Sequence, residues 1–275
     1  MKHTIMIDGK RKDIDIRPMD ESFIVYRKLY VPPLTPENIG IIAPHDDPPQ
    51  LERFRREGWL KIIEQFFTKQ VRALGSCAIL AWDGDGVIGK MHFTTKEMYN
   101  GFRQVGGWYC VDHESMPNII QSFSGEELAI LLASETKTLF MVCFNVGHFD
   151  SRYHRQGIAS AMVQLLKDWA RQRGWRRIET LSCPDIVPFR CLGPQHMRRS
   201  WLEQRGFSVV KETRVPTEDA GARRQAIEKI AAGRWDEDAW DFKFYPFNLA
   251  RVRDLASDSS WTDEYDKDYV MACDL

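Results

Sequence analysis

The segment that most constrains the fold is residues 138–182, in which two apolar runs flank a glycine and an amphipathic stretch. The first run, "TLFMVCFNV", is typical of a strand buried on both faces. From Gly157 onward the apolar residues recur on one helical face, and Gly174 is a natural helix end. The stretch "WRRIETLS" then predicts a second strand. Two strands joined by one short helix predict a right-handed crossover with parallel strands.

Other strands and helices are predicted on the N-terminal side of this crossover. The clearest is a hairpin over 77–94, in which "CAILAW" and "VIGKMHFT" flank the turn "DGDG". A helix over 124–135 is predicted to begin at Ser124, with Glu127 completing a capping box. The remaining predictions are a strand at "DIDIRPM", a helix at "ESFIVYRKLY", a proline-rich loop over 31–50, a helix over 51–67 and a strand at "VGGWYCV".

The C-terminal part is predicted to alternate helices and strands. The stretch "HMRRSWLEQRGF" predicts a helix that stops at Gly206, and "SVVKETRV" predicts a strand after it. A further helix is expected near "ARRQAIEKIAAG", and "YVMACDL" predicts a last strand.

Composition limits the classes of partner. The chain has 275 residues, 43% of them hydrophobic, which is enough for a sizeable core. Its formal net charge of -1 argues against a generally basic nucleic-acid binder. No run approaches the roughly 20 apolar residues needed to span a bilayer, and the start "MKHTIMIDGKRKD" lacks the apolar core of a signal peptide. We therefore expect a cytoplasmic protein with neither a nucleic-acid nor a membrane partner.

The six cysteines are scattered along the chain and are expected to be reduced. The one group worth weighing as a metal site is Cys183, Cys191 and His196, but it contains no C-x-x-C pair. We expect no metal.

Gly157 has two possible roles at the boundary between strand and helix. The first-turn N–H groups of a helix lie at the positive end of its dipole, so a glycine there can let a phosphate approach. Alternatively, the glycine serves only close packing of the helix on the sheet. Several arginines nearby could serve a phosphorylated ligand or form a solvated basic face: Arg152, Arg155, Arg171, Arg173, Arg176 and Arg177.

The stretch "HRQGIASAMVQLLKDWARQRGWRRIE" resembles the coenzyme A binding motif of the GNAT superfamily of acyl-CoA-dependent N-acyltransferases. That motif is Arg or Gln, two variable residues, Gly, one variable residue, then Gly or Ala. Here it corresponds to 154–159, with His154 departing from the pattern at the first position. The order of predicted elements is also similar to that of the family.

The resemblance implies an α/β (α+β) fold. Its mixed, mostly antiparallel sheet would contain a central parallel pair splayed around the cofactor and would be flanked by helices. It also implies a single GNAT-like domain over 1–275, with insertions at about 95–137 and 216–268. The insertions are rich in aromatic residues, which could form an acceptor pocket or a homodimer contact, or could simply pack in the core.

For the site, the resemblance implies that acetyl-CoA is a cosubstrate and that an amine attacks it directly. The end of the strand would bind the pantetheine arm, and the residues around Gly157 would bind the diphosphate. A backbone N–H near Asn145 or Val146 would polarise the thioester carbonyl. The cofactor-binding residues implied are Phe144, Asn145, Val146, His154, Arg155, Gln156, Gly157, Ile158, Ala159 and Ser160.

The proton-transfer groups are less clear. Many family members carry a tyrosine four residues before the glycine of the Gly-Phe turn, where this chain has Leu202. His148 and Asp150, just past the central strand, are the candidate catalytic residues, because histidine suits proton transfer near neutral pH. Alternatively, they are an ordinary loop histidine and a turn residue. Cys183 could approach the thioester, although a structural thiol is the simpler interpretation.

The functional prediction is an N-acetyltransferase that acts on a primary amine of an unidentified small-molecule or peptide acceptor. The missing tyrosine leaves open a non-catalytic acyl-CoA binding or sensing module. A third possibility is a nucleotide-binding protein that uses the same helix N-terminus for another phosphate ligand.

Overall fold

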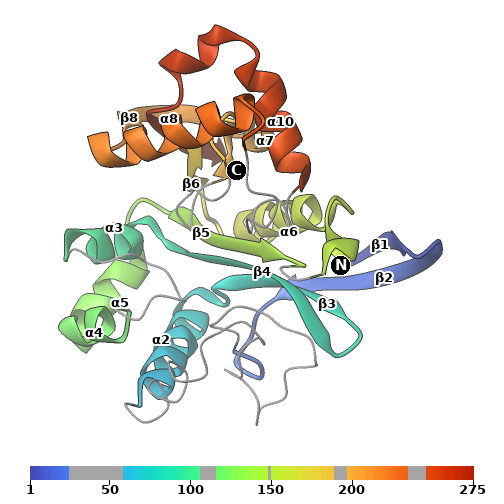
Figure 1. The fold of residues 1–275 in the computed structure, drawn as a ribbon. Helices are drawn as coiled ribbons and strands as arrows, with labels where there is room; N and C mark the ends of the chain where they lie inside the picture. Colours follow the sequence, from blue (N-terminus) through green and yellow to red (C-terminus); the bar gives the residue numbers. More distant parts are fainter. Residues whose placement is uncertain (25–57, 106–115, 148–149, 189–196, 235–245) are drawn as a thin grey trace. The chain divides into compact units, whose positions relative to one another are not determined.

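The computed structural model describes residues 1–24, 58–105, 116–147, 150–188, 197–234 and 246–275. The chain divides into two compact units (Figure 1). Unit 1 comprises Met1–Ile178 with Leu275, and unit 2 comprises Glu179–Asp274. The single domain with two insertions stays a prediction.

Unit 1 contains five antiparallel strands that lie side by side in chain order. They are β1 (Lys2–Ile7), β2 (Lys10–Pro18), β3 (Ala78–Asp83), β4 (Gly86–Thr95) and β5 (Thr138–Val146). The predicted strand at "DIDIRPM", the hairpin over 77–94 and the strand at "TLFMVCFNV" are confirmed. β1 was not predicted. It pairs with β2 through the turn at Asp8 and Gly9, whose positive φ values of 49° and 74° suit a tight hairpin.

Helices cover both faces of this sheet (Figure 1). They are α2 (Trp59–Leu74), α3 (Lys96–Gln104), α4 (Met116–Ser122), α5 (Gly125–Ala133) and α6 (Ile158–Gln172), with a 3-10 turn, η1, over Ser151–Tyr153. The ring of Phe93 on β4 lies 5.0 Å from that of Trp169 on α6. The ring of the next residue back, His92, lies 5.1 Å from that of Phe67 on α2. Because successive strand residues point to opposite faces, α6 and α2 lie on opposite faces of the sheet.

The predicted helices of unit 1 that lie in the described residues are present, but the end of one of them differs from the prediction. α6 and the Ser124–Glu127 capping box of α5 are confirmed. α2 continues past the predicted end at residue 67, because Val71 and Leu74 extend its buried face. It ends where the N–H of Gly75, at a φ of 85°, donates to the carbonyl of Val71.

Three predictions in unit 1 fall mainly or wholly outside the described residues, and two helices were not predicted. The proline-rich loop lies outside them, and so do most of the strand at "VGGWYCV" and most of the helix at "ESFIVYRKLY". The first residues of that predicted helix, through Ile24, form a turn instead. α3 and α4 lie in a segment whose apolar pattern is too irregular to predict them.

Unit 2 contains the predicted strands at "WRRIETLS", "SVVKETRV" and "YVMACDL". They are β6 (Arg177–Cys183), which begins at the unit boundary, β8 (Ser208–Arg214) and β9 (Lys267–Asp274), with β7 (Met197–Arg198) parallel to β6. β8 and β9 are antiparallel. The mixed, mostly antiparallel α/β fold is therefore confirmed, while a parallel pair splayed around a cofactor stays a prediction.

The helices of unit 2 pack around a separate core. They are α7 (Arg199–Glu203), α8 (Thr217–Ala231) and α10 (Pro246–Ala256), followed by the 3-10 turn η3 (Ser259–Asp263). α7 and α8 were predicted, and α10 was not. The core includes Cys183 of β6, Ile227 and Ile230 of α8 and Val252 of α10.

Neither a membrane-spanning helix nor a metal site is predicted from the sequence. No helix in the described ranges combines the length and apolar character needed to cross a membrane. Among the described residues no group of His, Cys, Asp and Glu could hold a metal ion, and both Cys191 and His196 lie outside them.

Candidate functional site

Gly157 starts α6 in a left-handed conformation, with φ at 79°. Its carbonyl accepts a hydrogen bond of 3.0 Å from the N–H of Ala161, the first bond of the helix. No acidic side chain stands in the first turn of α6 to neutralise the positive end of the helix dipole. This helix N-terminus is therefore suited to an anion, with the predicted residues Ile158, Ala159 and Ser160 forming its first turn.

Arg155 is also left-handed, with φ at 58°. A non-glycine residue with positive φ is uncommon and persists only where its surroundings hold it. Two left-handed residues separated by Gln156 give the chain a tight local curl just before α6. Such alternating conformations turn backbone N–H groups toward a common concavity that favours anions.

Gly157 is also required by packing within unit 1. A Cβ atom at this position would lie 3.3 Å from Nε2 and 3.4 Å from Cε1 of His3, on β1. The close-packing interpretation of this glycine is thus supported, except that the neighbour is the imidazole of His3 and not the sheet beneath α6. The contact with His3 does not exclude the phosphate interpretation, because a phosphate would bind the first-turn N–H groups of α6 and not the α-carbon of Gly157.

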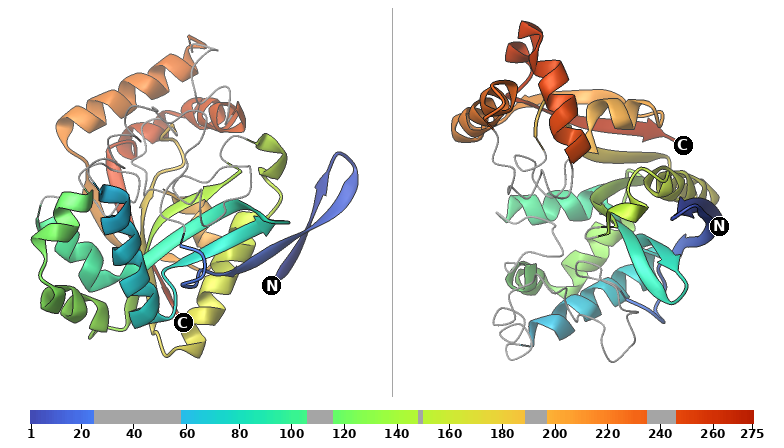
Figure 2. Two further views of the ribbon diagram at one scale, coloured as in Figure 1. Left: turned by 90° about the horizontal axis from the view of Figure 1, so that it is seen from below. Right: turned by 45° about the vertical axis from the view of Figure 1, so that its right-hand side comes forward.

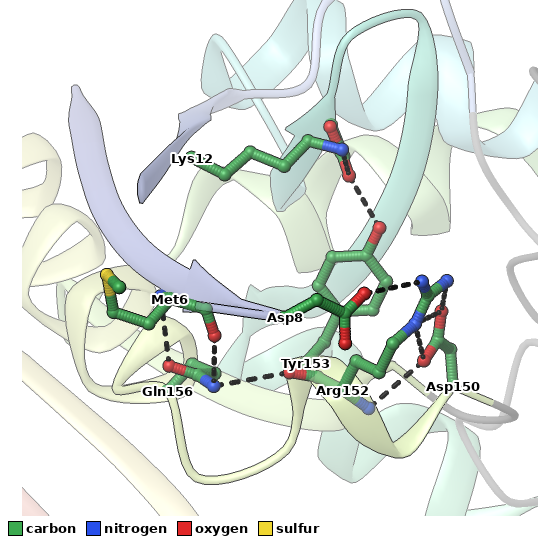
Figure 3. Close-up of polar contacts among 8 residues, drawn as sticks. Met6, Asp8, Lys12, Asp150, Arg152, Tyr153 and Gln156 are labelled. Carbon is green, nitrogen blue, oxygen red and sulfur yellow. Dashed lines mark hydrogen bonds and ion pairs between the residues drawn. The ribbon is translucent and has the colours of Figure 1, made fainter. Parts of the chain in front are cut away.

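The side chains of His154 and Gln156 contact other parts of the protein. Nε2 of His154 lies 2.7 Å from the carbonyl of Gly147. Nε2 of Gln156 donates to the carbonyl of Met6 over 2.8 Å, and Oε1 accepts from the N–H of Met6 over 3.4 Å (Figure 3). These two predicted cofactor-binding residues therefore support the loop with their side chains.

Asp150, predicted as catalytic, forms an ion pair with Arg152 (Figure 3). Its carboxylate accepts from the guanidinium over 2.6 Å and from the backbone N–H of Arg152 over 3.0 Å. These hydrogen bonds lower the pKa of Asp150, so the carboxylate is a poor proton acceptor near neutral pH. His148, the other predicted catalytic residue, lies outside the described residues.

Several of the arginines around α6 are occupied within the protein. Arg152 pairs with Asp150 and lies 3.7 Å from Asp8. Arg171 pairs with Asp168 over 3.1 Å, and Arg173 stacks over the ring of Trp169 at 4.6 Å. Their charges still contribute to the local potential, but these contacts fit the interpretation of a solvated basic face.

Gly147 joins the end of β5 to the loop before α6. Its N–H donates to the carbonyl of Ile88 over 2.8 Å, and its φ is 58°. A Cβ atom here would lie 2.8 Å from both the carbonyl oxygen of Asp150 and Cβ of Tyr153. Phe144, Asn145 and Val146, predicted to bind the pantetheine arm, are half-buried and immediately precede this junction. The end of β5 and the loop before α6 are therefore held together.

A network of polar contacts that was not predicted from the sequence anchors the same loop. The hydroxyl of Tyr153 donates to Oδ2 of Asp83 over 2.5 Å, and Nζ of Lys12 lies 2.6 Å from the same oxygen. Burial, together with the neighbouring carboxylate of Asp83, raises the pKa of Tyr153 well above its ordinary value. The three residues lie far apart in the chain, so no local spacing signals their contact.

A second group of polar residues is buried on β4. Lys90, His92 and Thr94 alternate along the strand and therefore share the face covered by α2. The hydroxyl of Thr94 donates to Oε1 of Gln70 on that helix over 2.8 Å. The polar alternation in "VIGKMHFT" is visible in the sequence, but it does not reveal that the residues are buried.

Two residues of unit 2 were singled out by the sequence, and both are buried. Leu202 lies on α7 and has no exposed surface. Cys183 is equally buried, and desolvation raises the pKa of its thiol to about 12. A thiol with this pKa is protonated at neutral pH, so the structural interpretation of Cys183 is confirmed.

Comparison with solved structures gives distant likenesses. The chain is similar to Ard1 from Thermoplasma volcanium at 9% identity, with 95% of this chain and 97% of that chain covered and a TM-score of 0.38. It is similar to the polyamine N-acetyltransferase of Drosophila melanogaster at 12% identity, with 75% and 90% covered and a TM-score of 0.37. It is also similar to a Bacillus subtilis acetyltransferase in complex with CoA at 12% identity, with 72% and 76% covered and a TM-score of 0.32. Likeness at this level carries no argument about substrate or mechanism.

The family comparison is more specific. No curated protein matches the sequence. The model of the acetyltransferase (GNAT) family matches residues 143–185, which run from β5 through α6 to just past β6. The matched segment contains Gly147, the left-handed Gly157 and the whole of α6, the features from which the site was built. Over these residues the chain is similar to the acetyltransferase (GNAT) family.

Proposed function

We propose that this protein is an N-acetyltransferase that transfers the acetyl group of acetyl-CoA to a primary amine. The observation that carries the proposal is the start of α6, where left-handed Arg155 and Gly157 precede a first turn without acidic side chains. This arrangement favours a phosphorylated ligand. The family match, which covers this segment, makes an acyl-CoA the natural choice among such ligands.

The chain's own residues would divide the binding as follows. Backbone groups of 154–160 would hold the diphosphate, and those of Phe144, Asn145 and Val146 would hold the pantetheine arm. A backbone N–H near Asn145 or Val146 would donate to the thioester oxygen. Such a donor contributes up to a few kcal/mol, because it acts on the charge that develops in the transition state.

In the proposed reaction the amine nitrogen forms a bond to the thioester carbon and the carbon–sulfur bond breaks. The sulfur leaves with its electron pair as the coenzyme A thiolate. The proton lost by the amine passes to a base, for which His148 is the proposed residue, or to water. The ion pair with Arg152 keeps Asp150 charged. We therefore assign Asp150 to ordering the turn over Ser151–Tyr153, which contains Arg152. Unchanged turnover and pH–rate profile in His148→Ala would exclude His148 as the base.

A non-catalytic acyl-CoA binding module is the second candidate. It is favoured by the complete burial of Leu202, at the position where many relatives carry a tyrosine that protonates the leaving thiolate. A coenzyme A thiolate is a tolerable leaving group, so a missing acid does not by itself prevent transfer.

Two measurements on the wild-type protein separate these candidates. A rise in melting temperature with acetyl-CoA, but not with ATP or NAD, is expected for both, because binding to the native state alone stabilises it. Release of coenzyme A thiol in the presence of a panel of primary amines is expected only for the enzyme. Stabilisation without thiol release with any amine would favour the binding module, and no stabilisation by acetyl-CoA would contradict both.

A further inference from the structure

The N-terminal hairpin, formed by β1 and β2, contacts the loop that precedes α6 at several points (Figure 3). From β1, Nε2 of His3 lies 2.8 Å from the carbonyl of Gln156, and both backbone groups of Met6 bond to the Gln156 side chain. From the hairpin turn, Asp8 lies 3.7 Å from Arg152. Lys12 of β2 reaches Tyr153 through Asp83. Figure 2 shows this hairpin, in blue, extending beyond the neighbouring strands of unit 1.

Gln156 occupies the place of a neighbouring strand. β1 is the end strand of the unit 1 sheet, and on its inner side Met6 is in register with Arg11 of β2. At Met6 the amide side chain of Gln156 donates to the carbonyl and accepts from the N–H, as a peptide group of another strand would. The same Nε2 also lies 3.3 Å from the carbonyl of Arg152. The side chain of Gln156 thus links β1 to the 3-10 turn over Ser151–Tyr153 as well as to the curl before α6.

The contacts from β1 are made to Gln156 and Gly157, in the part of the loop where the backbone is left-handed. Gln156 lies between two left-handed residues, and a left-handed Arg155 is maintained only by its surroundings. His3 bonds to the carbonyl of Gln156 and also lies beside Gly157, where its ring would crowd an added side chain. A binding loop that is already in its bound conformation loses less free energy to ordering when the ligand arrives.

We propose that the β1–β2 hairpin is a positioning element of the acyl-CoA site, and that Gln156 and His3 act through the backbone of residues 154–158. The inference rests on the proposed function. It differs from that proposal in assigning a role to a segment outside the family match, and in giving the Gln156 side chain a task other than contact with the ligand.

The test compares acetyl-CoA affinity in His3→Ala, Gln156→Met and the wild type. Each substitution removes the side-chain hydrogen bonds of one residue and introduces neither glycine nor proline. We expect dissociation constants about tenfold higher, as the loss of roughly one net hydrogen bond implies. In His3→Ala, whose side chain is not one of the proposed cofactor-binding groups, turnover at saturating acetyl-CoA should fall much less than affinity. His3→Gln should restore affinity, because its side-chain amide can still donate to the carbonyl of Gln156. Lys2→Ala, an exposed residue of the same strand, is the matched control.

Hydrogen exchange of the ligand-free proteins supplies a readout that does not depend on function. The amides of 154–158 should exchange faster in His3→Ala and Gln156→Met than in Lys2→Ala, while α2 and β4 exchange at wild-type rates. If the wild type binds acetyl-CoA and both variants bind it equally well, or if His3→Gln fails to rescue, the inference is overturned. If the wild type binds no acyl-CoA, the proposed function fails first, and the wild-type titration alone shows it.

Discussion

At the scale of single residues, Gly157 is constrained by its own conformation, by His3 and by the proposed ligand. The positive φ value disfavours any side chain by roughly 1–2 kcal/mol, and the imidazole restricts the space beside the α-carbon. A single substitution therefore mixes strain with any effect on a phosphate. Asparagine and aspartate tolerate the left-handed region better than other residues and have nearly the same shape, so comparing them isolates the charge.

We predict that Gly157→Asp weakens acetyl-CoA binding at least about tenfold relative to Gly157→Asn, since a negative side chain would stand beside the diphosphate. Both variants should lose similar stability to backbone strain. Isothermal titration calorimetry gives the affinities, and thermal melting without ligand checks that the two folds are equally stable. Equal affinities in the two variants would contradict the phosphate interpretation and leave only the packing role.

Leu202 presents a simpler case, because its side chain is fully buried. We predict that Leu202→Tyr lowers the free energy of unfolding by about 1–3 kcal/mol through overpacking, with a further loss if the phenol finds no hydrogen-bond partner. Leu202→Met, which nearly conserves volume, should cost less than about 1.5 kcal/mol. Urea unfolding measures both. A Tyr variant as stable as the wild type would contradict the assignment of Leu202 to a tightly packed core.

Among the elements of unit 2, Arg223 connects α8 to the start of β9 and to Tyr265 just before it. Its guanidinium, with only 5% of the side chain exposed, pairs with Asp268 over 2.8 Å. It also donates to the carbonyls of Lys267 over 3.1 Å and Tyr265 over 3.4 Å. Its neighbour Arg224 is exposed and pairs with Glu228 within the same helix.

We predict that Arg223→Ala destabilises unit 2 by on the order of 3–5 kcal/mol, because the largely buried ion pair with Asp268 and the hydrogen bonds to two carbonyls would be lost. Arg224→Ala should have little effect, as expected for an exposed pair. The readout is alkylation of Cys183, followed by peptide mass spectrometry at increasing urea, because this thiol reacts only when the core of unit 2 opens. Equal protection of Cys183 in the two variants would contradict the assigned role.

The elements that were predictable are those with local signals. The turn "DGDG" with its apolar flanks predicts the β3–β4 hairpin, and the spacing of apolar residues between two glycines predicts α6. β1 was missed because "KHTIMI" carries polar residues and is stabilised by β2 and by the loop before α6. Contacts such as Met6 with Gln156 are not encoded in any local pattern, since 150 residues separate the two.

At the scale of the whole molecule, the motif segment and the parts that support it come from different regions of the sequence. The family match begins near the end of β5, whereas the hairpin that contacts the loop lies at the N-terminus. The motif could therefore be recognised from the sequence, and its backbone role inferred, but its support could not. Likewise, Asp150 could be placed near the site from the sequence, while its ion pair with Arg152 required the structure.

We propose that the backbone of 154–160 binds the diphosphate of an acyl-CoA. The most direct measurement is the two-dimensional amide NMR spectrum of the uniformly labelled protein during titration with coenzyme A, with pantetheine as the control that lacks the diphosphate. We expect saturable shifts that are largest for the amides of 156–160 with coenzyme A and small there with pantetheine. Shifts elsewhere in unit 1 that spare these amides, or equal shifts at 156–160 with both compounds, would contradict it.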